Sequence, residues 1–154
     1  MTAYKQPVSV LVVIYTAELE VLLLERAAHP GFWQSVTGSR ESSESMLATA
    51  SREVSEETGL DASQYKLDDW HKTNQYEIFT EWRHRYAPGV TQNTEHVFGL
   101  LLPDRQPVTI SPAEHRQWRW AGWREAADAC FSASNREAIL ELPARLAKQN
   151  QAPQ

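Results

Sequence analysis

The segment from Gly38 to Leu60, GSRESSESMLATASREVSEETGL, constrains the fold more than any other part of the chain. Residues 45–58 are predicted to form a helix, because apolar residues recur there at helical spacing. Ser45 is a candidate N-cap, and Gly59 occupies the position after the helix where glycine is favoured. The expected apolar stripe consists of Leu47, Ala50 and Val54.

The same predicted helix carries three glutamates close together. Glu53 and Glu57 lie one turn apart on one face, and Glu56 flanks them. Like charges at this spacing destabilise a helix by about 0.2–0.5 kcal/mol per pair, so their presence needs a reason. A solvated helix face is one interpretation. The other is half of a site for a hard divalent cation such as Mg²⁺, with Arg52 orienting a carboxylate by a charge-assisted hydrogen bond.

Composition narrows the function classes. The 154 residues suit one domain, which we expect to span residues 1–154 with a frayed tail at about 148–154. Hydrophobic residues make up 42% and charged residues 23%, which is enough for a packed core. The net charge of −5 argues against a nucleic-acid partner but permits a small anionic substrate. The single cysteine, Cys130, rules out a disulfide framework and favours a reducing, cytoplasmic setting.

Strands and helices interleave along the chain without regular βαβ units. PVSVLVVIY and EVLLLER are predicted to form a buried hairpin, and the first run is too short and β-branched for a signal peptide or a membrane span. Further strands are expected at SVTGS, YEIFTEWRHRY, EHVFGLLLP and QWRWAG. Helices are expected at WREAADAC and from Ser134, where Glu137 completes a capping box, with Pro143 kinking or ending the second. The pattern predicts an α/β fold, a mixed β-sheet sandwiched between helices.

The longer pattern around the glutamates carries a resemblance to a known family. Gly38, Glu44 and the run REVSEETGL at residues 52–60 match every fixed position of the Nudix box, G-x5-E-x7-R-E-U-x-E-E-x-G-U, where U is bulky and aliphatic. The chain therefore resembles the Nudix hydrolases, which cleave nucleoside diphosphates linked to another group. The resemblance implies an α/β/α sandwich with a loop–helix–loop catalytic motif, and Mg²⁺ or substituting Mn²⁺ on the helix glutamates.

Roles follow from the resemblance position by position. Glu53 and Glu57 are implied metal ligands, and Glu56 and Glu114 are each implied as a further ligand or as the general base. Arg52 orients a carboxylate, and Glu44 braces the loop. A carboxylate outside the metal shell can accept the proton of the attacking water.

Segments outside the box resemble a bacterial branch of the family that acts in folate synthesis. These are KQPVSVLVVIY, FWQSVTGS, EIF with RHRYAPGVTQNTE, and EHRQWRW. The resemblance implies hydrolysis of dihydroneopterin triphosphate to dihydroneopterin monophosphate and pyrophosphate. The implied substrate-binding residues are Lys5, Arg26, Trp33, Thr37, Tyr76, Glu77, Ile78, Phe79, Arg83, Arg85, His115 and Ser132.

Some of these residues suit such a substrate on their own chemistry. Lys5 and Arg26 lie at strand ends and could bind phosphate, and the YEIF run could supply an aromatic wall and backbone hydrogen bonds to a flat ring. Arg83 and Arg85 would point the same way from a strand, either at the triphosphate or at solvent along a sheet edge.

Two other functions stay open. One is a housecleaning pyrophosphohydrolase acting on deoxynucleoside triphosphates or oxidised nucleotides. The other is a ligand-sensing domain, which the intact box disfavours. The expected partner is thus a small pterin or nucleoside triphosphate, with no nucleic acid and no membrane.

Overall fold

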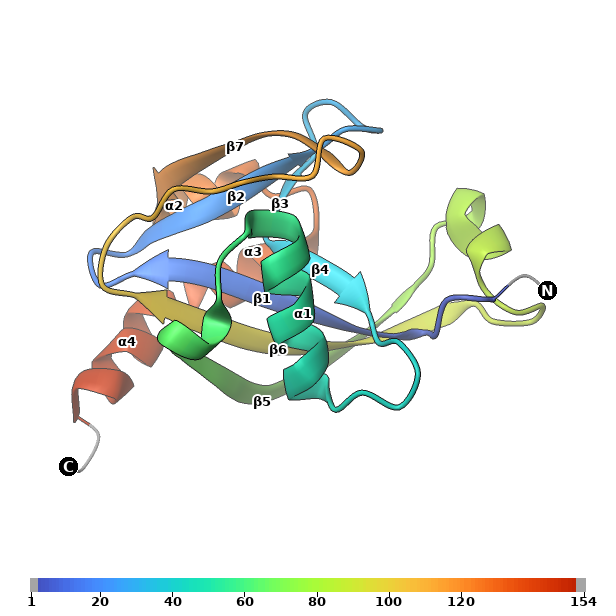
Figure 1. Cartoon of the computed structure of the whole chain (residues 1–154), viewed down its shortest axis with the longest axis horizontal. Helices are drawn as coiled ribbons and strands as arrows, with labels where there is room; N and C mark the ends of the chain where they lie inside the picture. Colours follow the sequence, from blue (N-terminus) through green and yellow to red (C-terminus); the bar gives the residue numbers. More distant parts are fainter. Residues whose placement is uncertain (1–2, 152–154) are drawn as a thin grey trace.

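The computed structural model describes residues 3–151. A mixed sheet forms the centre, with α1 on one face and α2 and α3 on the other (Figure 1). The predicted sandwich is thereby confirmed. The strands are β1 (Val8–Thr16), β2 (Glu20–Arg26), β3 (Trp33–Gln34), β4 (Val36–Ser39), β5 (Lys66–Glu77), β6 (Gln92–Leu102) and β7 (His115–Gly122). The α-helices are α1 (Met46–Thr58), α2 (Trp123–Ala129), α3 (Ala133–Leu140) and α4 (Leu142–Gln151), and the 3₁₀ helices are η1 (Ala62–Gln64) and η2 (Thr80–Arg85).

Strand β1 changes partner along its length, and this positions the site. The predicted hairpin with β2 is present, but β1 and β2 are paired at Tyr15 and Val21, near the turn. Farther from the turn, β4 lies antiparallel to β1, from Ser9 paired with Ser39 to Val12 paired with Val36. On its other side β1 runs parallel to β6. Strand β2 is thereby free to pair with β3 and β7.

The alternation of side chains along the buried strands produces two hydrophobic clusters, one on each face of the sheet. The α1 cluster includes Val10, Val12, Phe98 and Val54 of α1. The second cluster packs against α2, α3 and α4 and includes Leu11, Val13, Val97, Ala126 and Ile139. Fully burying a valine, leucine, isoleucine or phenylalanine side chain stabilises the fold by about 1.5–3 kcal/mol.

The helical segment begins and ends as predicted. The Ser45 hydroxyl accepts a hydrogen bond from the Ala48 amide at 3.0 Å, and Gly59 adopts a left-handed φ of 74° after the last turn. One part of the predicted stripe is wrong, because the Leu47 side chain is 53% exposed. Thr49 is buried beside Ala50 instead, which rotates the packed face toward the sheet.

Two other local predictions are wrong, and a third is confirmed. The strand expected at YEIFTEWRHRY ends at Glu77 and is followed by η2, whereas β5 begins much earlier, in polar sequence that suits a half-exposed edge strand. Ser132, not Ser134, caps α3 by accepting the Asn135 amide. The helix is interrupted near Pro143 as expected, because α3 ends at Leu140 and α4 begins at Leu142, with Pro143 in the first turn of α4, where its missing N–H costs little.

The carboxyl-terminal segment is more ordered than expected. Helix α4 continues to Gln151, through most of the predicted tail, and residues 152–154 lie outside the described residues. Among the helices of the described part, none has the length and apolar character needed to cross a bilayer.

Candidate active site

The loop before α1 is held to the helix by an arginine. Arg52 forms two hydrogen bonds with the Glu44 carboxylate, from Nε at 2.8 Å and from Nη2 at 3.0 Å. Nη2 also donates to the Ser39 carbonyl at 2.9 Å. The Arg52 guanidinium, together with the Glu41 amide, holds the pKa of Glu44 at about 2. The guanidinium therefore joins the end of β4, the loop and the helix.

The same guanidinium orients the helix carboxylates. Its Nη1 donates to Glu53 at 2.7 Å and to Glu56 at 3.1 Å. The fork of donors that arginine provides matches several carboxylates at once, which a lysine ammonium cannot do in the same geometry. Glu53 is buried, whereas the Glu56 side chain is 54% exposed and faces solvent.

Gly38 of β4 provides the space that Glu53 occupies. A Cβ at position 38 would lie 2.1 Å from the carboxyl carbon of Glu53. A side chain at position 38 would therefore push away the Glu53 carboxylate, which the Arg52 guanidinium holds in place. The absence of a side chain lets the carboxylate lie directly against the strand backbone.

Glu57 is the most deeply buried of the three helix glutamates, at 2% exposed. Burial raises its pKa well above the usual range, and the neighbouring Glu53 raises it further. Oε1 is buried without a hydrogen-bond partner in the described part of the chain, and His115 Nε2 lies 3.7 Å from it. His115 is itself buried, and burial followed by the charge of Arg26 lowers its pKa to about 4, so it is neutral at pH 7.

Basic groups gather next to these carboxylates. Burial and the charge of Arg85 are the two largest causes that lower the pKa of both Lys5 and Arg26. Glu114, on the loop before β7, raises the pKa of each and so lies close to both. The Lys5 amide donates to the Arg85 carbonyl at 2.9 Å, which places the N-terminal segment against η2. Three mutually repelling cations at one place form a site for an anion.

The buried carboxylates fit a divalent metal ion. Glu53 and Glu57 offer oxygen ligands, the kind that a hard cation prefers, and Glu57 Oε1 has no other partner in the described residues. A cation would also relieve the repulsion between the two carboxylates. Within the described residues, no group of three His, Cys, Asp or Glu side chains forms a ready-made metal cage. The two glutamates would thus supply part of a coordination sphere.

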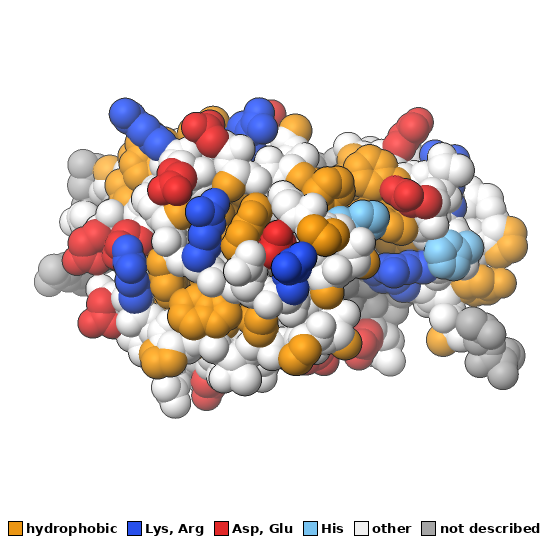
Figure 2. Space-filling model, turned by 90° about the horizontal axis from the view of Figure 1, so that it is seen from above, with side chains coloured by type: hydrophobic (Ala, Val, Ile, Leu, Met, Phe, Trp, Pro, Cys, Tyr) orange, Lys and Arg blue, Asp and Glu red, His pale blue; other side chains and the backbone are white. Residues whose placement is uncertain are grey.

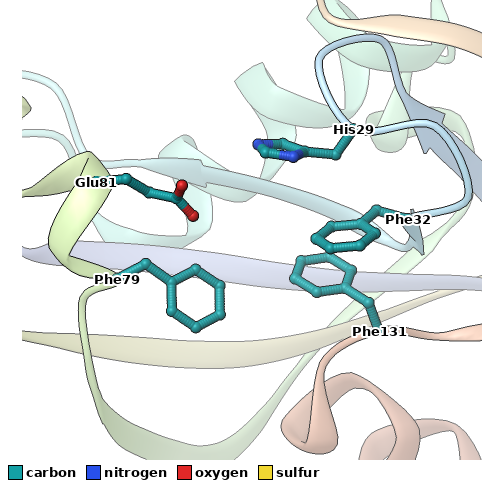
Figure 3. Close-up of a pocket in the computed structure, with 5 residues that line it drawn as sticks. All are labelled: His29, Phe32, Phe79, Glu81 and Phe131. Atoms are coloured by element: carbon teal, nitrogen blue, oxygen red, sulfur yellow. The ribbon is translucent and has the colours of Figure 1, made fainter.

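An aromatic pocket of about 570 Å³ lies beyond the basic cluster. It is lined by His29, Phe32, Phe79, Glu81 and Phe131, which surround an open space in Figure 3. The Phe32 ring stacks on Phe131 at 4.7 Å and on His29 at 5.1 Å between centroids. A pocket with flat apolar walls suits a flat heterocycle.

One side chain links the pocket to the basic cluster. The Trp82 ring lies 5.7 Å from the His29 ring between centroids. The Arg26 guanidinium lies 4.9 Å from the centroid of the Trp82 ring. A ligand with a ring in the pocket would therefore have its anionic end near the cations.

The structure brings together some of the predicted substrate-binding residues. Lys5, Arg26 and Arg85 form the basic cluster, and Phe79 lines the pocket. Thr37 lies on β4 beside Glu57, and its amide lowers the pKa of that carboxyl.

Other predicted substrate-binding residues have structural partners. The Arg83 side chain donates to the Ile78 carbonyl and lies 3.9 Å from Glu77, so the strand argument that paired it with Arg85 is wrong. The Ile78 amide already donates to the Thr91 carbonyl. Trp33 packs into the second hydrophobic cluster. His115 is buried against Glu57, and Ser132 caps α3. Tyr76 is 43% exposed, and its hydroxyl accepts a hydrogen bond from the Asn93 amide.

Sequence reasoning missed Phe32, Phe131, His29, Glu81 and Trp82. They come from the loop after β2, the segment before α3, and η2, which are far apart in the chain. No periodic pattern or motif marks them, since an aromatic residue in a loop has no local signature.

Replacing Arg52 by lysine is expected to lower kcat/KM by about 10–100-fold if the helix carboxylates bind a metal ion, because that is the usual effect of losing a group that orients metal ligands. The pKa of Glu44 should rise toward its ordinary value. A depressed carboxyl pKa stabilises the fold above the unfolded value of about 4.3, and this stabilisation is lost as the pH falls through about 2. The variant should therefore lose Tm at pH 7 and much less near pH 2. Arg124→Lys, at an exposed arginine, is the control and should change neither quantity.

The surface around β2 and β7 carries both signs of charge. In the space-filling view, acidic and basic side chains lie side by side across this face, with apolar side chains between them (Figure 2). Such a mixed surface differs from the basic stripe of a general nucleic-acid binder.

Comparisons with known proteins agree with this geometry. A family model described as NUDIX domain matches residues 5–142. The dihydroneopterin triphosphate diphosphatase of Escherichia coli K12 is 48% identical over 142 residues, which cover 90% of this chain and 93% of that protein. The Haemophilus influenzae protein of the same name is 41% identical over 142 residues, which cover 90% of this chain and 89% of that protein.

A solved structure gives the same result. That of the E. coli dihydroneopterin triphosphate pyrophosphohydrolase has a TM-score of 0.83 and 48% identity, and the match covers 89% of this chain and 94% of that one. The expected family and fold are confirmed. The chain belongs to the NUDIX domain family.

Proposed function

We propose that this protein hydrolyses dihydroneopterin triphosphate to dihydroneopterin monophosphate and pyrophosphate, with Mg²⁺ as the metal and Mn²⁺ as a possible substitute. The observation that carries the proposal is the buried pair Glu53 and Glu57 beside the cations Lys5, Arg26 and Arg85, with an aromatic pocket adjoining. The names of the two bacterial relatives, which match over nearly their whole length, support the pterin substrate.

The metal would be held by Glu53 and Glu57, with Glu56 and Glu114 as further ligands. A divalent ion at such a site neutralises phosphate oxygens and lowers the pKa of bound water. Glu56 and Glu114 are both exposed and differ in this from the buried pair. Whichever of them stays outside the metal shell would accept the proton of the attacking water.

The remaining residues of the chain bind and orient the substrate. Lys5, Arg26 and Arg85 neutralise phosphate charge, so their mutual repulsion is relieved when the triphosphate arrives. Arg52 keeps the carboxylates in one arrangement before the metal and substrate bind, which reduces the reorganisation needed during the reaction. Phe32, Phe79 and Phe131 provide flat surfaces for the pterin ring.

The direct test compares kcat/KM for dihydroneopterin triphosphate with a panel of deoxynucleoside triphosphates in the presence of Mg²⁺. We expect the pterin substrate to be preferred by more than about tenfold, which is a difference of about 1.4 kcal/mol in transition-state stabilisation. Mass spectrometry should identify the monophosphate and pyrophosphate, and ¹⁸O-labelled water should reveal the phosphorus attacked. A tenfold preference for any deoxynucleotide would assign the housecleaning function instead.

A cytoplasmic location completes the proposal. It is supported by the single buried thiol, Cys130, and by the use of the proposed product in folate synthesis.

A further inference from the structure

A buried polar group interrupts the apolar sheet face that α3 covers. Asn93 and Glu95 alternate along β6 and point to the same face as Val97 of the second hydrophobic cluster. They are only 2% and 5% exposed. Ser9, paired with Glu95 on β1, is also buried and accepts a hydrogen bond from Asn93 at 2.7 Å. Burying such groups lowers stability, so their retention suggests a binding role.

Glu95 has one free carboxylate oxygen. Oε1 accepts from Ser134 Oγ at 2.9 Å and from Asn74 Nδ2 at 3.3 Å, whereas Oε2 accepts no hydrogen bond from the described residues. Oε2 is also not among the fully buried atoms that lack a partner, so it is not completely enclosed. Both partners are neutral, and burial raises the pKa of the carboxyl.

Glu95 contacts the segment that leads to one wall of the aromatic pocket and lies beside the strand that leads to another. Ser134, which donates to Glu95, closely follows Phe131 in the chain. Tyr76 closely precedes Phe79, pairs with Asn93 across β5 and β6, and accepts a hydrogen bond from the Asn93 amide at 3.0 Å. Figure 3 shows Phe79 and Phe131 facing each other across the space.

We propose that Glu95 determines which ring the pocket accepts, with Oε2 accepting an N–H from the exocyclic amino group of a 2-amino-4-oxopyrimidine ring. Pterins and guanine share this edge, whereas hypoxanthine lacks the amino group. The inference rests on the proposed function in one respect, that the ring of a triphosphate substrate occupies this pocket.

Asn93 is a second buried polar group next to Glu95. Its Nδ2 donates to Ser9 and to the Tyr76 hydroxyl, and its Oδ1 is buried without a partner in the described part of the chain. Turning the amide round would leave the nitrogen unpartnered instead, so one end of the side chain is free in either orientation. A site built to bond a polar group rejects an analogue that lacks it, because its own buried groups are then left unsatisfied.

The experiment compares Glu95→Gln with the wild-type protein, using GTP and ITP, which differ by the 2-amino group alone. Affinities are measured by calorimetry without added metal, so that hydrolysis does not interfere. The wild type is expected to bind GTP about 10- to 100-fold more tightly, the range for a hydrogen bond to a charged group. In the variant the ratio should fall to about one, because the glutamine amide would present a donor to the ring's donor.

The variant should fold normally. Glutamine keeps an oxygen for Ser134 and Asn74, and a neutral amide replaces a carboxyl whose raised pKa makes it unfavourable at pH 7, so Tm should stay equal or rise. Glu137→Gln, at an exposed position of α3, is the control and should leave the GTP-to-ITP ratio unchanged.

Each outcome bears on a separate conclusion. Equal wild-type affinities for GTP and ITP, binding of neither, or an equal loss for both in Glu95→Gln would overturn the role of Glu95. Turnover of dihydroneopterin triphosphate is measured in parallel. If the wild type fails to hydrolyse it and the GTP-to-ITP ratio still collapses in the variant, the substrate proposed above is wrong and the ring-edge role stands.

Discussion

Glu57→Gln is expected to lower kcat by at least about 100-fold while leaving the protein folded. The substitution removes one buried carboxylate charge from the proposed metal site, and even groups that only orient metal ligands change activity by about 10–100-fold. Glutamine has nearly the same shape, so packing beside His115 is retained. Steady-state kinetics with Mg²⁺, together with circular dichroism, checks both parts.

The same variant should respond differently to pH and to metal. Burial raises the pKa of Glu57 above its unfolded value, so in the metal-free protein its stabilising contribution exists below about pH 4.3 and is lost as the pH rises through the folded pKa. Glu57→Gln should therefore be at least as stable as the wild type at pH 7 without metal. Mg²⁺ at 100 times its Kd should stabilise the wild type by about 2.7 kcal/mol and the variant far less.

Glu18→Gln provides the matched control, since Glu18 is exposed at the β1–β2 turn. It should change neither turnover nor the effect of Mg²⁺ on Tm. Full activity in Glu57→Gln would remove this residue from the proposed metal site.

Gly38→Ala is expected to damage stability and activity together. The added methyl would lie 2.1 Å from the Glu53 carboxyl carbon, so either the carboxylate or β4 must move. Such overpacking destabilises a protein by about 1–3 kcal/mol. Displacing a proposed metal ligand should also lower kcat/KM by about 100-fold, by the same reasoning as for Glu57. Urea unfolding and steady-state kinetics measure the two effects.

Two further variants isolate the cause. Gly122→Ala adds a methyl where no atom lies within 4 Å, and at φ −58° the backbone accepts alanine, so little change is expected. Combining Gly38→Ala with Glu53→Ala removes the clash, so the stability loss of Gly38→Ala should largely vanish in that background while activity stays low. Additive stability losses in the double variant would show that the contact with Glu53 is not the reason glycine is needed.

The sequence predicted the parts of the site that depend on local spacing. The caps of α1, the shared face of Glu53 and Glu57, and the reach of Arg52 to Glu56 all follow from helix geometry and are present. The buried β1–β2 hairpin could also be predicted from the sequence, because runs of β-branched residues are typical of core strands.

The rest depends on tertiary packing. The stacking of Phe32 on Phe131 arises when two distant loops meet, and the different environments of Arg83 and Arg85 arise because η2 replaces a strand. Glu95 could not be recognised either, since burial of a carboxylate is visible only once α3 covers β6. Residue patterns within one segment predict its helix or strand, whereas the pocket forms only through contacts between segments that are distant in the sequence.

The division of the interior into two clusters has a consequence for how such a protein can change over generations. The proposed metal-binding helix α1 packs on one cluster, whereas Glu95 and Phe131 border the other, with the sheet between them. Substitutions in separate, non-touching regions have nearly additive effects on stability. Substitutions at Glu95 or Phe131 that changed the ring preference would therefore leave the stability of the α1 side nearly unchanged. The machinery for breaking the phosphate bond would be inherited intact.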